Sequence, residues 1–135
     1  MNQRPLTPVA VGILRRDNGD VLLAQRPPGK PYAGYWEFPG GKIEAGESAA
    51  AGLARELHEE LGIVDTDAQW LITQRHDYPH AYVELQFFIV TEWSGDIHPQ
   101  EGQAVAWQTP GAYTVEPMLP ALLTDDSEVL ARLER

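Results

Sequence analysis

Apolar residues along the chain follow two spacings, and each spacing predicts one type of secondary structure. Short apolar runs and alternating apolar and polar positions are typical of β-strands, whereas a repeat every three to four residues is typical of an amphipathic helix. The strand pattern occurs at residues 9–14, 21–25, 35–38, 70–73, 82–91 and 104–108, of which 82–91 is expected to be the longest strand. The helix pattern occurs at residues 48–61 and again at 128–133.

Turn and loop signals separate these segments and indicate how they connect. Asn18-Gly19 lies between the first two strand segments and predicts a β-hairpin. Residues 26–31 contain three prolines, which cannot donate to a strand ladder, so a loop is expected there. Pro39-Gly40-Gly41 breaks the third strand segment, and residues 94–103 form a polar loop. We therefore predict a single α/β (α+β) domain over residues 1–135, with helices packed on a mixed sheet.

The helix at residues 48–61 has well-marked ends and one apolar face. Ser48 is a good N-cap, and Gly62 is a natural C-terminal stop. The residues expected to form the buried stripe are Ala50, Leu53, Leu57 and Leu61. The helix thus has sequence signals at both of its ends.

Composition limits the chemistry that this domain can perform. The 135 residues include no cysteine, which excludes disulfides, thiol catalysis and cysteine-ligated metals. The net charge of −10 and the lack of a basic patch argue against binding a nucleic-acid polymer. An acidic protein can still bind a small phosphorylated ligand when divalent cations lie between its carboxylates and the phosphates. No apolar run is long enough to cross a membrane and no signal peptide is evident, so a cytoplasmic location is expected.

Carboxylates gather on one flank of the predicted helix. At about 100° per residue, Glu60 lies close to the apolar stripe, with Glu56 and Glu59 farther around the same flank. Glu56 and Glu60 repel each other at this spacing, and partial burial increases the cost. Bound divalent cations would remove both penalties. Arg55 lies about one turn before Glu59, where it can orient Glu59 or Glu47 through an ion pair.

The segment before the helix also suits a metal or a phosphate. Residues 40–47 contain a tight glycine loop whose backbone can approach a ligand closely. Each feature alone is equally well explained by a glycine-terminated loop followed by a solvated, charged helix. The combination favours a functional site.

Residues 41–63 resemble the Nudix box at every defined position. The matching residues are Gly41, Glu47, Arg55, Glu56, Leu57, Glu59, Glu60, Gly62 and Ile63. Nine constrained positions over 23 residues make this motif highly specific. The flanks 11–13, 23–26, 36–44 and 101–103 extend the resemblance to the MutT-type branch of the family.

The resemblance implies a Nudix fold, an α/β/α sandwich around a mixed sheet, and hydrolysis of a (deoxy)nucleoside triphosphate to the monophosphate and pyrophosphate. The implied cofactor is Mg²⁺, with Mn²⁺ as an alternative. The implied metal ligands are Gly41, Glu56, Glu59, Glu60 and Glu101. The implied catalytic residues are Arg55, Glu56, Glu59 and Glu60, with Glu56 the first choice and Glu101 the second for activating water. The implied substrate contacts are Arg26, Phe38 and Tyr78.

The base preference stays open at this stage. Oxidised-guanine hydrolases of the MutT branch read the base with an Asn after a Pro-Ala step, but Pro120-Ala121 is followed here by Leu122. The substrate is therefore either 8-oxo-dGTP or another nucleotide such as CTP or a modified dCTP. A nucleotide-binding regulatory module without hydrolysis is the alternative from a different class. His76 and His80 are not expected to bind metal, because Pro79 interrupts any helix between them. Either a monomer or a homodimer is consistent with the sequence.

Overall fold

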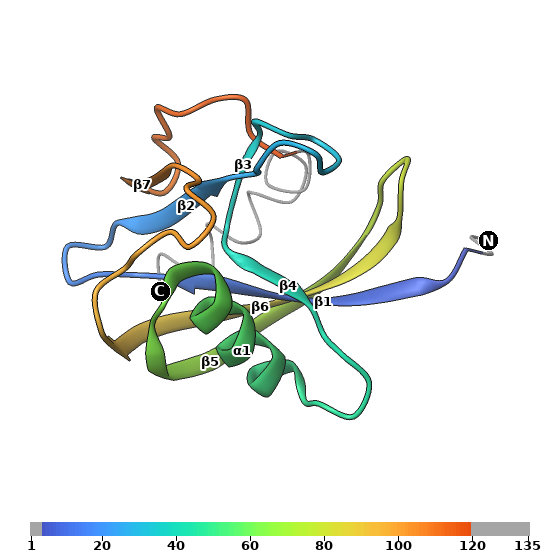
Figure 1. Cartoon of the computed structure of the whole chain (residues 1–135), viewed down its shortest axis with the longest axis horizontal. Coiled ribbons are helices and arrows are strands. Elements are labelled where there is room, and N and C mark those ends of the chain that lie inside the picture. Colours follow the sequence, from blue (N-terminus) through green and yellow to red (C-terminus); the bar gives the residue numbers. More distant parts are fainter. Residues whose placement is uncertain (1–3, 120–135) are drawn as a thin grey trace.

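The computed structural model describes residues 4–119. These residues form one helix and two sheets (Figure 1). In chain order the elements are β1 (Leu6–Leu14), β2 (Val21–Gln25), β3 (Trp36–Glu37), β4 (Gly40–Lys42), α1 (Ala49–Leu61), β5 (Val64–Asp77), β6 (Tyr82–Ser94) and β7 (Val105–Gln108). The helix expected at 128–133 lies outside the described residues, which hold one helical layer of the expected sandwich, α1.

The larger sheet has the strand order β4-β1-β6-β5. β1 pairs parallel with β6 and antiparallel with β4, while β5 and β6 pair antiparallel. The sheet is therefore mixed, as predicted. The smaller sheet has the order β3-β2-β7, and both of its pairings are antiparallel. In Figure 1 its strands lie together at the upper left, apart from α1.

The β1–β2 connection is a correction to the sequence prediction. The turn forms where expected, with the Gly19 amide donating to the Arg16 carbonyl at 2.8 Å. The two strands nevertheless belong to different sheets, and only an isolated Arg15–Val21 bridge joins them. β6 pairs along the whole length of β1 on one edge, and β4 pairs at Val9–Val11 on the other. The Gly12 amide next to them donates to the Pro39 carbonyl, so β2 can pair with β1 only near Arg15 before the chain crosses to the second sheet.

Two further strand predictions are wrong in their extent. β5 runs over Val64–Asp77 and is the longest strand, with 14 residues, where only residues 70–73 were expected. The sequence pattern did not reveal the full strand, because β5 lies at the sheet edge and its side chains are exposed or half-buried and often polar. The segment at Gly40 is a short strand rather than only a loop. A side chain at Gly40 would overlap the carbonyl oxygen of Ala10, so glycine is what permits this pairing.

The helix follows the sequence prediction closely. The Ser48 hydroxyl accepts a hydrogen bond from the Ala51 amide at 3.1 Å, and Gly62 ends the helix at φ 75°. Its buried residues are Gly52, Leu53, Leu57 and Leu61. Ala50, predicted to join that stripe, is exposed instead, and Gly52 is buried against Glu47 and Ile43.

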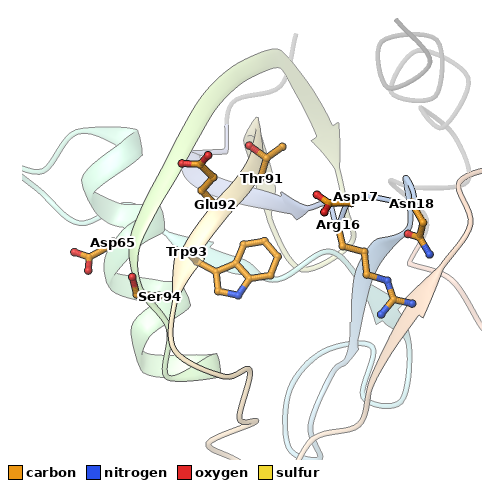
Figure 2. Close-up of a pocket in the computed structure, with 8 residues that line it drawn as sticks. All are labelled: Arg16, Asp17, Asn18, Asp65, Thr91, Glu92, Trp93 and Ser94. Atoms are coloured by element: carbon orange, nitrogen blue, oxygen red, sulfur yellow. The ribbon is translucent and has the colours of Figure 1, made fainter.

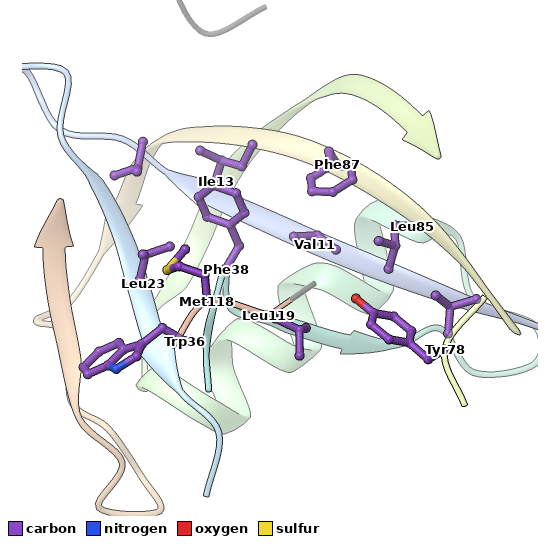
Figure 3. Packing of buried hydrophobic residues seen from close by; sticks show 12 residues of the cluster. Val11, Ile13, Leu23, Trp36, Phe38, Tyr78, Leu85, Phe87, Met118 and Leu119 are labelled. Carbon is purple, nitrogen blue, oxygen red and sulfur yellow. The ribbon is translucent and has the colours of Figure 1, made fainter. Parts of the chain in front are cut away.

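Two apolar clusters lie on opposite faces of the larger sheet, because side chains alternate along its central strands. Ala10 and Leu14 of β1 pack with the helix leucines, whereas Val11 and Ile13 face the second cluster. Figure 3 shows this second cluster, in which Trp36 and Phe38 meet residues of β1 and β6. Burial on both faces explains why β1 reads as a continuous apolar run. The face that carries the second cluster also borders the cleft described next.

Candidate active site

A cleft of about 730 Å³ lies beside the glycine-rich strand β4 and the acidic flank of α1. Residues of the 26–32 loop, the β5–β6 turn and the loop at 101–103 complete its walls. Most of the predicted site residues line it, namely Arg26, Phe38, Gly41, Glu56, Glu60, Tyr78 and Glu101. The structure therefore brings together residues that lie up to 75 positions apart in the chain.

Glu56 and Glu60 lie side by side at the bottom of this cleft, next to Gly41. The missing Gly41 side chain leaves space for the Glu56 carboxyl group, because an added Cβ would overlap it. Burial raises the pKa of Glu60 to about 8, and the neighbouring charges of Glu56 and Glu37 act in the same direction. A hydrogen bond with the Glu56 side chain adds to the rise, and one with the Gly40 backbone opposes it.

Arg55 stands behind the two acids and connects the helix to the segment before it. Its guanidinium contacts Glu47 at 2.7 Å, Glu56 at 3.0 Å and Glu59 at 3.3 Å. It also donates to the Lys42 carbonyl at 3.0 Å. Hydrogen bonding from Arg55 holds the pKa of Glu47 below its ordinary value, and the acids raise the pKa of Arg55 in turn. The predicted ion pairs are confirmed.

Two predicted site residues do not line the cleft. Arg55 lies behind it, and Glu59 is exposed, with 57% of its side chain accessible. Over residues 4–119, no three Asp, Glu or His side chains are grouped in a way that could hold a metal ion. The full set of four glutamates and Gly41 as a shared ligand set thus stays a prediction.

Glu101 reaches the cleft from a loop tied to the C-terminal end of α1. The Gln100 amide donates to the Glu60 carbonyl at 2.9 Å. The Glu101 amide in turn donates to the Gln103 side chain at 3.0 Å. These bonds place the exposed Glu101 at the rim of the cleft, on the side of Glu60.

Arg26 is held by its surroundings rather than free in the cleft. Its Nη1 donates to both carboxylate oxygens of Glu37, at 3.0 and 3.1 Å, and its Nε donates to the Pro31 carbonyl at 2.7 Å. Burial raises the pKa of Glu37, and Arg26 opposes the rise. Glu37 was not assigned a role from the sequence. The available signal was an acidic residue between two large aromatic residues in a strand, Trp36 and Phe38.

Phe38 and Tyr78, the two aromatic residues predicted to contact substrate, are part of the apolar core and also line the cleft. Phe38 is 4% exposed and packs edge-on against Phe87, and Tyr78 is 5% exposed. The ring of Tyr78 stacks on His80 with centroids 5.3 Å apart and lies 5.7 Å from Tyr32. Burial lowers the pKa of His80, as do Arg26, Arg4 and Lys42. Tyr32 and His80 line the cleft although the sequence did not single them out as substrate contacts.

A second hollow lies away from these residues, and it contains none of the predicted ones (Figure 2). It is an open depression in which Arg16 lies over the ring of Trp107, and Trp93 stacks on that same tryptophan. Its acids, Asp17, Asp65 and Glu92, are exposed, and none of its lining residues is a buried base or nucleophile. Among the described helices, none is long and apolar enough to cross a membrane.

The fold and the cleft define a hydrolase of the Nudix class, and comparison with known proteins agrees. The model of the NUDIX domain matches residues 6–133, so the chain belongs to the Nudix family. An 8-oxo-dGTP diphosphatase of Proteus vulgaris is 42% identical over 94 residues, which cover 70% of this chain and 84% of that protein. A CTP pyrophosphohydrolase of Escherichia coli is 38% identical over 113 residues, covering 84% and 83%.

A solved structure from a study of MutT of Aliivibrio salmonicida and Vibrio cholerae is similar over nearly the whole chain. Its TM-score is 0.76 at 32% identity, covering 94% of this chain and 98% of that one. The chain is thus a MutT-type Nudix hydrolase, and members of this family generally use divalent metals. The alternative of a module that binds without hydrolysing finds no support in these likenesses.

Proposed function

We propose that this Nudix hydrolase cleaves a (deoxy)nucleoside triphosphate to the monophosphate and pyrophosphate with Mg²⁺ as its cofactor. The observation that carries the proposal is the pair of adjoining carboxyl groups, Glu56 and Glu60, beside Gly41 in a cleft large enough for a nucleotide. Relatives named for hydrolysis of 8-oxo-dGTP and of CTP support the substrate class.

The donor set of the cleft fits a hard divalent cation. In the metal-free protein Glu60 favours its protonated form, because burial disfavours its charge and the neighbouring Glu56 carboxylate disfavours it further. A cation would take the place of that proton. Magnesium prefers carboxylate and carbonyl oxygens, so we assign Glu56, Glu60 and the Gly41 carbonyl as ligands, with Glu59 and Glu101 completing the set. When bound, Mg²⁺ neutralises phosphate charge and holds the reacting groups in line.

The remaining chemistry falls to residues of the chain. Glu56 orients the attacking water and accepts its proton, while Glu101 is the second choice for that role. The water oxygen bonds to phosphorus as the bridging P–O bond to pyrophosphate breaks. Arg55 is a positioning residue, because its contacts with Glu47, Glu56 and Glu59 fix the direction of their carboxylates. Arg26, Phe38 and Tyr78 contact the nucleotide from the walls of the cleft.

The base preference has two candidates, each supported by a different relative. The rings of Phe38, Tyr78 and the neighbouring His80 line the cleft, and a planar base of either kind could stack on them. The expected Asn after Pro120-Ala121 is missing from the sequence, which favours a cytosine nucleotide or a broad range over strict selection of 8-oxo-dGTP. Residues 120–125 lie outside the described residues, so this point rests on sequence alone.

Pyrophosphate release from a panel of nucleotides tests the proposal. The panel contains dGTP, 8-oxo-dGTP, CTP, dCTP and 5-methyl-dCTP, each with Mg²⁺ and each compared with the Glu60→Gln variant. We expect at least one nucleotide to give monophosphate and pyrophosphate in equal amounts, with a loss of about 100-fold or more in the variant. Glu92→Gln, which removes an acid in the second hollow, is the matched control and should keep full activity. If no nucleotide is turned over faster than by Glu60→Gln, the proposal is wrong.

A further inference from the structure

The chain contains only two lysines, Lys30 and Lys42, and both line the cleft. Within residues 4–119, neither has an ion pair or a hydrogen bond from its ammonium group. Five arginines of the same region have carboxylate partners, and these are Arg4, Arg16, Arg26, Arg55 and Arg75. In a chain with twice as many acids as bases, these two lysines face the same cleft without a carboxylate partner among residues 4–119.

Lys30 lines the cleft from the loop between β2 and β3, which hydrogen bonds hold at several points. Its own carbonyl accepts from the Ala33 amide at 3.1 Å. Arg26 donates to the Pro31 carbonyl and accepts from the Gly34 amide, at 2.7 and 2.9 Å. The loop is therefore built in a defined shape, although the Lys30 side chain itself is exposed.

The next residues of this loop are fixed against the far side of the cleft. The ring of Tyr32 lies 5.7 Å from that of Tyr78 and 5.6 Å from that of His80. These contacts join the loop to the turn between β5 and β6, so both ends of the Lys30 segment are anchored. A lysine carried by such a segment loses little further backbone entropy when it binds a ligand.

The nearest acid does not explain why Lys30 is there. The charge of Lys30 lowers the pKa of Glu37, but both Glu37 carboxylate oxygens already accept hydrogen bonds from Arg26. Arg4 and Arg26, which act on His80 together with Lys42, are each paired with a carboxylate. No ion pair within residues 4–119 neutralises Lys30 in the same way.

We propose that Lys30 binds a phosphate group of the nucleotide substrate in the cleft that it lines together with Glu56 and Glu60. This inference rests on the proposed function, and it adds a specificity residue that lies outside the Nudix box. The acids and their cation engage the phosphate chain, and the Lys30 ammonium donates to a phosphate oxygen. The site would therefore select substrates by their number of phosphates as well as by their base.

The test compares Lys30→Met with Lys30→Arg in steady-state hydrolysis of the best nucleotide of the panel. We expect KM to rise about tenfold in Lys30→Met with kcat within about twofold, because one charge-assisted hydrogen bond is lost. Lys30→Arg keeps the charge and should stay within about threefold of the wild type. Lys30→Met should also show a weaker dependence of kcat/KM on salt concentration.

Arg16→Gln is the matched control, because it removes one positive charge at the second hollow (Figure 2). Its KM should stay within about twofold of the wild-type value. An equal rise of KM in Arg16→Gln and Lys30→Met would mean that only net charge matters, and the inference would be overturned. Circular dichroism and thermal unfolding of each variant confirm that the comparison is between folded proteins.

A binding measurement separates failure of this inference from failure of the proposed function. Inorganic tripolyphosphate, titrated calorimetrically in the presence of Mg²⁺, carries the phosphates without a base and needs no turnover. We expect its Kd to rise about tenfold in Lys30→Met. An unchanged Kd and KM in Lys30→Met would overturn the inference while leaving hydrolysis intact. Lack of turnover by the wild type on every nucleotide would overturn the proposed function, whatever the tripolyphosphate result.

Discussion

Gly41 leaves the space that the carboxyl group of Glu56 occupies. The two residues are 15 positions apart in the chain, and β4 brings one against the side of α1 that carries the other. A methyl group at position 41 would overlap the carboxyl carbon of Glu56, and this glycine needs no unusual backbone angle. The requirement at Gly41 is therefore one of space, unlike that at Gly62, whose φ of 75° ends the helix.

Gly41→Ala should therefore reduce activity much more than stability. The new methyl group forces the Glu56 side chain away from Glu60, while the backbone of β4 can accept alanine. We expect kcat to fall by about 100-fold, in line with loss of a positioned acid or base, and Tm to change by only a few degrees. Nucleotide hydrolysis and thermal unfolding of the same preparation check this, and a variant with wild-type kcat would contradict it.

The metal-free protein should become less stable as the pH rises from 5 to 8. The pKa of Glu60 is about 8 in the folded protein, against an ordinary value of 4.5 for the unfolded chain. The folded state therefore binds more protons between these values, so the stability from this group is complete below pH 4.5 and is lost as pH rises toward 8. The raised pKa of Glu37 acts in the same direction.

Urea unfolding in the presence of a chelator, at several pH values, measures this dependence. Glu60→Gln should flatten the decline and leave only the smaller part due to Glu37, because the amide cannot titrate. Glu92→Gln provides the control, since its exposed carboxylate lies in the second hollow. A slope in Glu60→Gln equal to that of the wild type would show that Glu60 is not the group responsible.

Removing the divalent cation should abolish hydrolysis and lower the melting temperature. A ligand that binds only the folded state stabilises it by about 2.7 kcal/mol at 100 times its Kd. Thermal unfolding with and without Mg²⁺ therefore gives a measurable upward shift in the wild type. The shift should be much smaller in Glu56→Gln and unchanged in Glu92→Gln. Full activity in excess chelator would contradict the assigned site.

The pair between Arg26 and Glu37 should contribute to stability more than an exposed pair does. Both side chains are mostly buried, with exposed fractions of 20% and 28%. Arg26→Met leaves the Glu37 carboxylate without its counterion, and we expect a loss of about 1–2 kcal/mol in the free energy of unfolding. Glu84→Gln breaks the more exposed pair with Arg75 and should cost less than about 0.5 kcal/mol. Urea unfolding of both variants decides this, and equal losses would count against the prediction.

Several parts of the site could be predicted because they depend on neighbours within one helix. The helix pattern placed Glu60 beside the buried leucines, and the structure confirms both its partial burial and the closeness of Glu56. Arg55 lies one turn from Glu59 and makes the expected ion pairs. Ala50 is the exception, because it is exposed while Gly52 is buried beside Glu47 and Ile43. Such contacts follow from the 3.6-residue repeat and need no knowledge of the remaining fold.

Other parts could not be predicted, because they depend on which strands become neighbours. The Asn18-Gly19 turn is locally correct, but β4 and β6 occupy both edges of β1 and separate the expected hairpin into two sheets. β5 was predicted too short, since an edge strand with exposed faces carries little hydrophobic pattern. The role of Glu37 was missed for the same reason, because only the folded chain places it between Arg26 and Glu60.

By itself, the sequence determined the helix, its caps, its acidic flank and the family to which the chain belongs. All of these depend on the spacing of residues that are close together in the chain. Tertiary structure alone decided that Glu56 fits against Gly41, that Arg26 is paired with Glu37, and that Lys30 lines the same cleft as the acids. The physical reason is distance along the chain. Local spacing dictates which side chains share one helix face, whereas strand pairing and burial of the two cores decide which distant segments form the walls of the cleft.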